Sequence, residues 1–280
     1  MQRGIKGRSQ LDQRAIALDP QFAVGHIFIP RKGGNAEETK ARARDIMSRF
    51  GLRVLAERQE VVNSSALGAT AREEEPIFWQ VGGLTGEARL CFEITVALEQ
   101  ELDVHVASFS TDTCVYKVMG APSVLGNYYP DLLDERAETA AVLGHNRYST
   151  NTWPSFKRVQ PFAMLGHNGE INTIAKLRQE ARMLNVPIHP DGSDSQDLNR
   201  TVESLVHRGS LSLVEAIELV LPPIVNEIKQ LPEELRASVR RFGLGGPQRD
   251  HRPAAVAGRY VDADCASSSK GSFGGTAASV

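Results

Sequence analysis

The chain has 280 residues and a mass of 30.6 kDa, which is enough for one large domain or two small ones. Its 41% hydrophobic and 24% charged residues are ordinary for a globular protein, and a formal net charge of −2 excludes an overall basic field for nucleic acid or an anionic membrane. The apolar runs are too short to span a bilayer and the basic first residues lack the apolar core of a secretory signal, so we expect a cytoplasmic protein.

The first half of the chain carries strand and helix patterns in turn. Asn35 begins a predicted helix with Glu38 as its capping-box partner, and Gly51 ends it. Apolar residues recur every four positions over 86–103, which predicts a second helix. The predicted strands are Phe22–Ile29, Leu52–Val62, Pro76–Val81, Val104–Phe109 and Cys114–Met119. The last two of them flank the polar segment 110–113, which favours a hairpin.

The second half contains two short apolar runs and then three helices. The runs, Ala140–Leu143 and Pro161–Leu165, are each followed directly by Gly-His-Asn. Capping-box patterns mark the beginnings of the second and third helices at Ser193 and Ser212. The predicted helices cover 171–184, 194–208 and 212–221. Blocks of helices and paired strands of this kind are typical of an α+β fold.

The composition changes near Leu235. In residues 236–280 basic residues outnumber acidic ones, and Gly, Ser and Ala cluster at the end. The apolar residues are too few to compensate for the entropy lost on ordering, so we predict a disordered tail at 236–280 after a domain at 1–235.

The cysteines Cys91, Cys114 and Cys265 are widely spaced and odd in number. The chain has no Cys-x-x-Cys pair and no His/Cys cluster, so we expect neither a disulfide framework nor a metal site. Buried, inert thiols are the favoured interpretation.

Several polar residues between 144 and 194 are suited to binding an amino acid. Arg147 offers a planar, permanently charged fork for a carboxylate, and Thr150 and Asn151 follow closely enough to add to that contact. Asp194 lies in a Gly-Ser-Asp-Ser turn, where its carboxylate is a candidate acceptor for a substrate ammonium. Taken singly, Arg147 is equally explained by a structural ion pair and Asp194 by a helix cap.

Asn168 and Gly169 are candidates for an oxyanion hole. The Asn168 amide and the Gly169 backbone N–H are two neighbouring donors, and Gly lets its backbone approach a ligand closely. Taken alone, Asn-Gly is more typical of a type I′ hairpin turn. His145 and His167 precede Asn residues, but we assign neither of them a catalytic role and interpret both as hydrogen-bonded structural groups.

Together these motifs resemble the class II, N-terminal-nucleophile glutamine amidotransferases. The RYST sequence at 147–150 is similar to the family's carboxylate-binding motif, HNG at 167–169 to its oxyanion motif, and SD at 193–194 to the motif that holds the glutamine amine. The extensions at 151–152 and 170–173 are similar to the large chain of glutamate synthase.

The resemblance implies a four-layer αββα sandwich of the N-terminal-nucleophile hydrolase type, which we expect to be incomplete here. It also implies release of ammonia from glutamine, for glutamate formation from 2-oxoglutarate. The implied partners are glutamine, the remaining synthase domains and a small electron-donating subunit. FMN and an iron–sulfur cluster are implied for the full-length enzyme, with no cofactor in this chain.

The family's nucleophile is a cysteine at the mature N-terminus, whose own α-amine takes the thiol proton. Here the sequence begins Met1-Gln2, and Cys91 and Cys114 carry no free α-amine. We therefore expect a chain truncated at both ends and inactive as given. The alternatives are a glutamine-binding protein without catalysis and an α+β interaction module.

Overall fold

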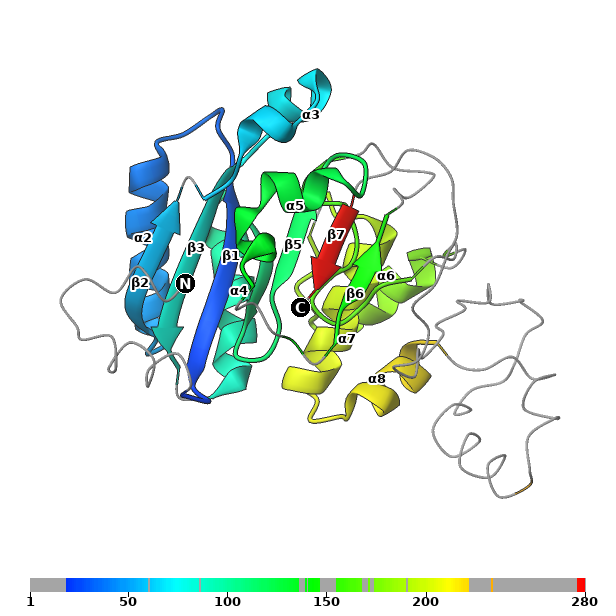
Figure 1. Cartoon of the computed structure of the whole chain (residues 1–280). Coiled ribbons are helices and arrows are strands. Elements are labelled where there is room, and N and C mark those ends of the chain that lie inside the picture. The colour runs from blue at the N-terminus through cyan, green and yellow to red at the C-terminus, as the bar shows by residue number, and fades with distance from the viewer. Residues whose placement is uncertain are drawn as a thin grey trace. The chain divides into compact units, whose positions relative to one another are not determined.

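The computed structural model describes residues 19–59, 61–85, 87–135, 139, 141–146, 155–167, 171, 174–189, 191–221, 233 and 276–279. It divides into two compact units. The first unit is Met1–Gly166 with Asp262–Val280, and the second is His167–Val261. Helices and antiparallel sheets make up the described part, as Figure 1 shows, so the fold is of the α+β kind that the sequence predicts.

A four-stranded antiparallel sheet is the centre of the first unit. Its strands are β1 (Phe22–Ile29), β2 (Arg53–Gln59), β3 (Ile77–Leu84) and β4 (His105–Ser110), in the order β2-β3-β1-β4. β1 pairs with β3 along its whole length, and its pairing with β4 shifts register between His26 and Ile27. β1 has the predicted bounds, while β2 is shorter than predicted and β3 extends further.

One face of this sheet is covered by α2 (Ala36–Arg49) and α4 (Ala88–Glu101). Successive strand residues point to opposite faces, so every second residue of β1 joins this core. Ile27 of β1 and Trp79 of β3 pack in one cluster with Ile46 of α2 and with Ile94 and Leu98 of α4. The four-residue apolar repeat predicted for α4 is therefore its buried face.

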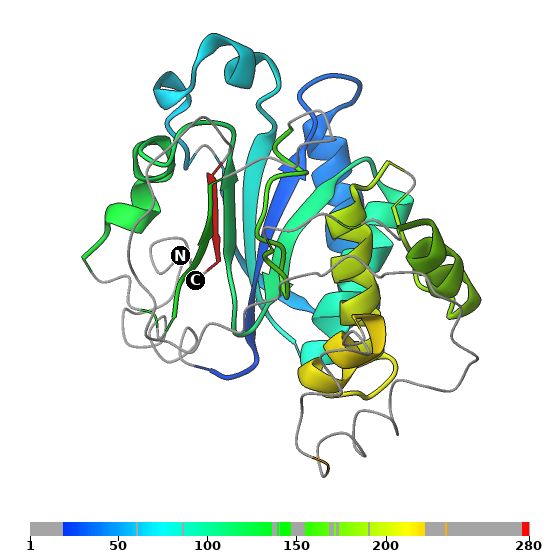
Figure 2. The same cartoon turned by 90° about the vertical axis from the view of Figure 1, so that its right-hand side faces the viewer.

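The opposite face is covered by a three-stranded sheet and the segments next to it. This sheet has the order β5-β7-β6, with β5 at Val115–Val118, β7 at Thr276–Ser279 and β6 at Leu143–His145. Phe28 and Phe78 from the four-stranded sheet pack with Val118, Tyr128 and Tyr129. The first unit is thus built of a helix layer and two sheet layers, which Figure 2 shows edge-on.

His26 joins the two sheets. Its Nδ1 lies 2.9 Å from the Val115 carbonyl oxygen, and the Val115 N–H donates to Ser108 Oγ at 2.9 Å. Because a carbonyl only accepts, Nδ1 carries the proton, and Nε2 accepts from Gln80 Nε2 at 3.1 Å. His26 is 1% exposed and its ring lies edge-on to Tyr116. A single neutral tautomer therefore satisfies both ring nitrogens.

Four short helices lie in the connections between strands of each sheet, two between β2 and β3 and two between β5 and β6, and the sequence patterns predicted none of them. They are η1 (Ser64–Ala66), α3 (Ala69–Glu73), α5 (Val124–Tyr128) and η2 (Pro130–Leu133). Buried Glu75 ties these segments together, since it accepts hydrogen bonds from Arg31, Ser64 and Tyr128. Its charge is thereby compensated away from water.

The second unit contains α6 (Ile174–Met183), α7 (Asp194–His207) and α8 (Leu213–Val220). Capping boxes begin α7 at Ser193 and α8 at Ser212, which confirms both predictions. No helix among the described residues is long and apolar enough to cross a membrane.

The predicted hairpin was wrong. Val104–Phe109 and Cys114–Met119 do not pair, because β4 and β5 belong to different sheets. Of the two short apolar runs, the first leads into the strand β6 at Leu143–His145, whereas Pro161–Leu165 forms no helix or strand.

The predicted cap of α2 needs correction. Asn35 accepts from the Glu37 N–H at 3.0 Å, but the predicted capping box, in which the Glu38 side chain accepts from the Asn35 N–H, is not formed. Within the predicted tail the structure describes only the strand β7 at 276–279, so disorder of the tail stays a prediction. The rest of the tail and the predicted boundary at Leu235 lie outside the described residues.

Acid should destabilise the first unit through His26. Burial lowers the pKa of His26 from the ordinary 6.5 to about 4. The unfolded chain takes up a proton near pH 6.5 and the folded chain only near pH 4, so stability present above pH 6.5 is lost as the pH falls to 4. We predict a loss of roughly 3 kcal/mol from this group. Urea unfolding across this pH range measures it, and His26→Gln should flatten the dependence; an equally steep curve for His26→Gln would refute the assignment.

Candidate functional site

Asp194 is the first residue of α7, at a tightly capped helix end. The Ser193 hydroxyl accepts from the Gln196 N–H, and the Gln196 side chain accepts from the Ser193 N–H at 2.9 Å. Asp194 Oδ1 accepts from the Ser195 N–H at 2.7 Å and from its hydroxyl at 3.2 Å. Oδ2 accepts no hydrogen bond from any residue that the structure describes. Oδ1 is thus held by two hydrogen bonds from Ser195, at a helix end that favours negative charge.

A hydrogen bond joins the beginning of α7 to the segment before the Asn-Gly motif. His167 Nε2 lies 2.7 Å from Ser195 Oγ, and both residues are buried. Ser195 Oγ also lies 3.2 Å from Asp194 Oδ1, so the Ser195 hydroxyl lies between His167 and Asp194 in one chain of polar contacts. His167 immediately precedes Asn168, so two of the predicted motifs have neighbouring residues in direct contact.

Arg178 of α6 holds the same turn from the other side. Its Nε donates to Asp197 Oδ2 at 2.6 Å, and its Nη2 donates to the Gly192 carbonyl at 3.2 Å. Burial raises the pKa of Asp197, and the Arg178 charge opposes this. A Cβ at Gly192 would lie 2.9 Å from Asp197 Oδ1 and 3.1 Å from the His189 carbonyl oxygen. The turn therefore has no room for a side chain at position 192.

The structure places only one of the six predicted site residues. Asp194 is described above; the other five, Arg147, Thr150, Asn151, Asn168 and Gly169, lie outside the described residues. β6 ends at His145, two residues before Arg147. Sequence reasoning identified this turn through the capping pattern at Ser193 and the Ser-Asp motif, but not the supporting roles of Arg178, Ser195 and Asp197.

The two described thiols are unsuited to act as nucleophiles. Burial raises the pKa of Cys91 and of Cys114 to about 11, so both are protonated near neutral pH. Cys91 is buried on α4, as predicted, whereas Cys114 is only half-buried. Cys265 lies outside the described residues.

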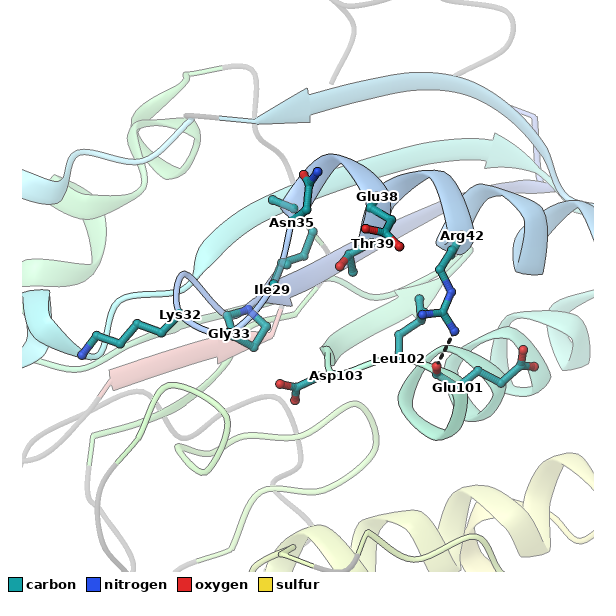
Figure 3. Close-up of a pocket in the computed structure, with 13 residues that line it drawn as sticks. Ile29, Lys32, Gly33, Asn35, Glu38, Thr39, Arg42, Glu101, Leu102 and Asp103 are labelled. Carbon is teal, nitrogen blue, oxygen red and sulfur yellow. Dashed lines mark hydrogen bonds between the residues drawn. The ribbon is translucent and has the colours of Figure 1, made fainter.

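A pocket in the first unit lies between the beginning of α2 and the end of α4. It has a volume of about 230 Å³, and charges of both signs line it, among them Lys32, Glu38 and Asp103. Figure 3 shows Arg42 reaching the Glu101 carbonyl across it, at 3.2 Å. Asp194, the one predicted site residue that the structure describes, is not among its lining residues, and its mixed charges favour no ligand class.

Known relatives agree on one family. Residues 7–242 match the model of the class-II glutamine amidotransferases. The large chain of NADPH glutamate synthase from Azospirillum brasilense is 31% identical over 278 residues, covering 88% of this chain and 18% of the relative. NADH glutamate synthase of Saccharomyces cerevisiae is 31% identical over 253 residues, covering 78% and 12%. The chloroplastic ferredoxin-dependent glutamate synthase of rice is 31% identical over 229 residues, covering 71% and 14%.

The matched region is therefore a small part of each relative, between 12% and 18% of its length in these three. It nevertheless extends over most of the present sequence and includes all six residues that the motifs single out. The chain belongs to the class-II glutamine amidotransferases.

Proposed function

We propose that the chain is the glutamine-hydrolysing part of a glutamate synthase, which releases ammonia from glutamine for glutamate formation from 2-oxoglutarate. The observation that carries the proposal is the hydrogen bond between His167 and Ser195, at 2.7 Å, in a chain of this family. This bond connects the first residue of the His-Asn-Gly motif with the residue after the predicted ammonium acceptor. The two motifs are 26 residues apart, from Asn168 to Asp194, so local structure alone does not explain the contact.

In the proposed site, glutamine is bound at both of its charged groups. Arg147 donates two hydrogen bonds to the α-carboxylate, with Thr150 and Asn151 adding donors beside it. Asp194 accepts from the α-ammonium through Oδ2, the oxygen that no described residue engages. An amino acid held at both ends presents its side-chain amide in one orientation, which lowers the entropic cost of reaction.

The proposed chemistry is nucleophilic substitution at the glutamine amide. A cysteine thiolate at a mature N-terminus, whose α-amine has taken its proton, attacks the amide carbon and forms a C–S bond. Asn168 and Gly169 donate to the oxyanion of the tetrahedral intermediate. The C–N bond then breaks, ammonia leaves with the proton from the α-amine, and water hydrolyses the thioester to glutamate. Cys91 and Cys114 have no part in these steps, because both are buried or half-buried protonated thiols.

The proposal includes the four-layer αββα sandwich of N-terminal-nucleophile hydrolases as the complete fold. The helix layer and two sheet layers of the first unit support it. The cytoplasmic location expected from the sequence is also part of the proposal.

The proposed partners are the remaining synthase domains and an electron-donating subunit. The three relatives are named for NADPH, NADH and ferredoxin, so we propose no particular donor. FMN and the iron–sulfur cluster are assigned to the full-length enzyme. Clusters are held by groups of cysteine thiolates, and the described residues contain no group of three or more Cys, His, Asp or Glu side chains able to hold a metal.

Glutamine binding tests the substrate assignment. Arg147→Ala should weaken binding by about 1.5–3 kcal/mol, the usual contribution of a hydrogen bond to a charged group, and Asp194→Asn should weaken it in the same range. Asp191→Asn is the matched control, because Asp191 is an exposed aspartate of the same turn. Isothermal calorimetry with glutamine, glutamate and asparagine measures these affinities. Binding that Asp194→Asn leaves unchanged would contradict the assignment of the ammonium acceptor.

Ammonia release tests the catalytic assignment. In a form of the protein whose mature chain begins with cysteine, Asn168→Ala should lower kcat by roughly 100-fold or more through loss of an oxyanion donor. Asn127→Ala, at an exposed position of α5, should leave kcat unchanged. Coupled detection of glutamate and ammonia gives both rates. An Asn168→Ala protein with the unaltered kcat would exclude this oxyanion hole.

A further inference from the structure

Arg178 contacts the Gly192–Asp197 stretch at two points that enclose Asp194. Gly192, two residues before Asp194, provides the carbonyl that accepts from Nη2 at 3.2 Å. Asp197, three residues after Asp194, provides the carboxylate that accepts from Nε at 2.6 Å. A planar guanidinium makes both bonds in fixed directions, so the distance between the two acceptors is set by one rigid group.

The helix end does not need Arg178 for its own hydrogen bonds. The Ser193–Gln196 capping box already satisfies donors at the beginning of α7. The bond from Arg178 to Gly192 acts instead on the turn before the helix. There the close approach of Asp197 Oδ1 to Gly192 leaves little freedom. Arg178 therefore constrains where the helix begins relative to α6, and Asp194 is the first residue at that point.

In the ion pair between Arg178 and Asp197, the carboxylate is the more deeply buried partner. The Asp197 side chain is 2% exposed and that of Arg178 is 34% exposed. Removing the guanidinium would leave a buried carboxylate without its charged partner, and Asp197 Oδ1 already has no hydrogen-bond partner among the described residues. We expect the turn to shift in response, which would move Asp194.

We propose that Arg178 is a positioning residue of the glutamine site: by holding Asp197 and the Gly192 carbonyl, it sets the place of the Asp194 carboxylate and thereby the affinity for the substrate ammonium. This inference rests on the proposed function. Arg178 itself does not contact the substrate in this scheme; it acts through Asp194.

A double-mutant cycle on glutamine binding tests the proposal. Arg178→Lys keeps the charge and loses the fixed fork, so glutamine affinity should fall about tenfold, a size usual for coupling within one hydrogen-bond network. In an Asp194→Asn background the same substitution should have almost no further effect. Lys176→Gln, which removes an exposed pair with Glu180 on the same helix, is the control and should leave affinity unchanged. Calorimetry with glutamine gives all the dissociation constants.

The outcomes separate this inference from the proposed function. If Arg178→Lys lowers glutamine affinity equally with and without Asp194→Asn, or in neither background, Arg178 does not act through Asp194 and the positioning role is wrong. The effect of Asp194→Asn alone still tests the glutamine site in that case. An unaltered chain that does not bind glutamine would refute the proposed function itself. Asp197→Asn is a second variant and should reproduce the Arg178→Lys result. If thermal unfolding shows that both variants fail to fold, the pair is a stability element and the proposal is wrong.

Discussion

Burial of the central sheet on both faces is the constraint on which the first unit depends. β1 packs against the helices α2 and α4 on one side and against the β5 sheet on the other, so nearly every position of β1 is buried. A polar group there requires a partner for each of its hydrogen-bonding atoms. His26 meets this requirement through Val115 and Gln80. The same bond fixes β5 against β1, and with it the sheet whose strand β6 leads toward Arg147.

In the second unit, the side-chain contacts that fix the backbone gather at the beginning of α7. The capping box, the His167–Ser195 bond and the Arg178 contacts all converge within a few residues of Asp194. None of them uses Asp194 Oδ2. A side chain that is already held in place loses little conformational entropy when it binds a ligand, so the proposed role of Asp194 would require little further ordering.

The sequence was sufficient to predict those helix and strand ends that neighbouring residues determine. β1 is rich in apolar and aromatic residues and stops before Pro30, and α7 and α8 carry capping boxes, so the end of β1 and the beginnings of α7 and α8 were predictable. The Val104–Met119 region was misjudged because strand spacing suggested a hairpin. The two strands instead part, and β5 pairs with β7, more than 150 residues away in sequence. No local pattern carries such a pairing.

Some features of the candidate site were likewise predictable from the sequence and others were not. The motifs identified residue types suited to glutamine, and for Asp194 the structure adds a carboxylate whose Oδ1 is held by Ser195 and whose Oδ2 accepts from no described residue. The contacts of Arg178 with Asp197 and Gly192 were not predictable, because they join side chains on different elements whose spacing has no helical or strand period. Arg147, Thr150, Asn151, Asn168 and Gly169 remain predictions from the motifs and the family.

The central claim is that glutamine binds at the beginning of α7, and NMR of the backbone amides during a glutamine titration tests it most directly. The account predicts saturable shifts that are largest at 192–197 and at 166–167, the segment that the His167–Ser195 bond connects to α7. Shifts that are largest around the pocket between α2 and α4, lined by Asn35 and Asp103, would contradict it. So would the absence of any saturable change at Asp194 and its neighbours.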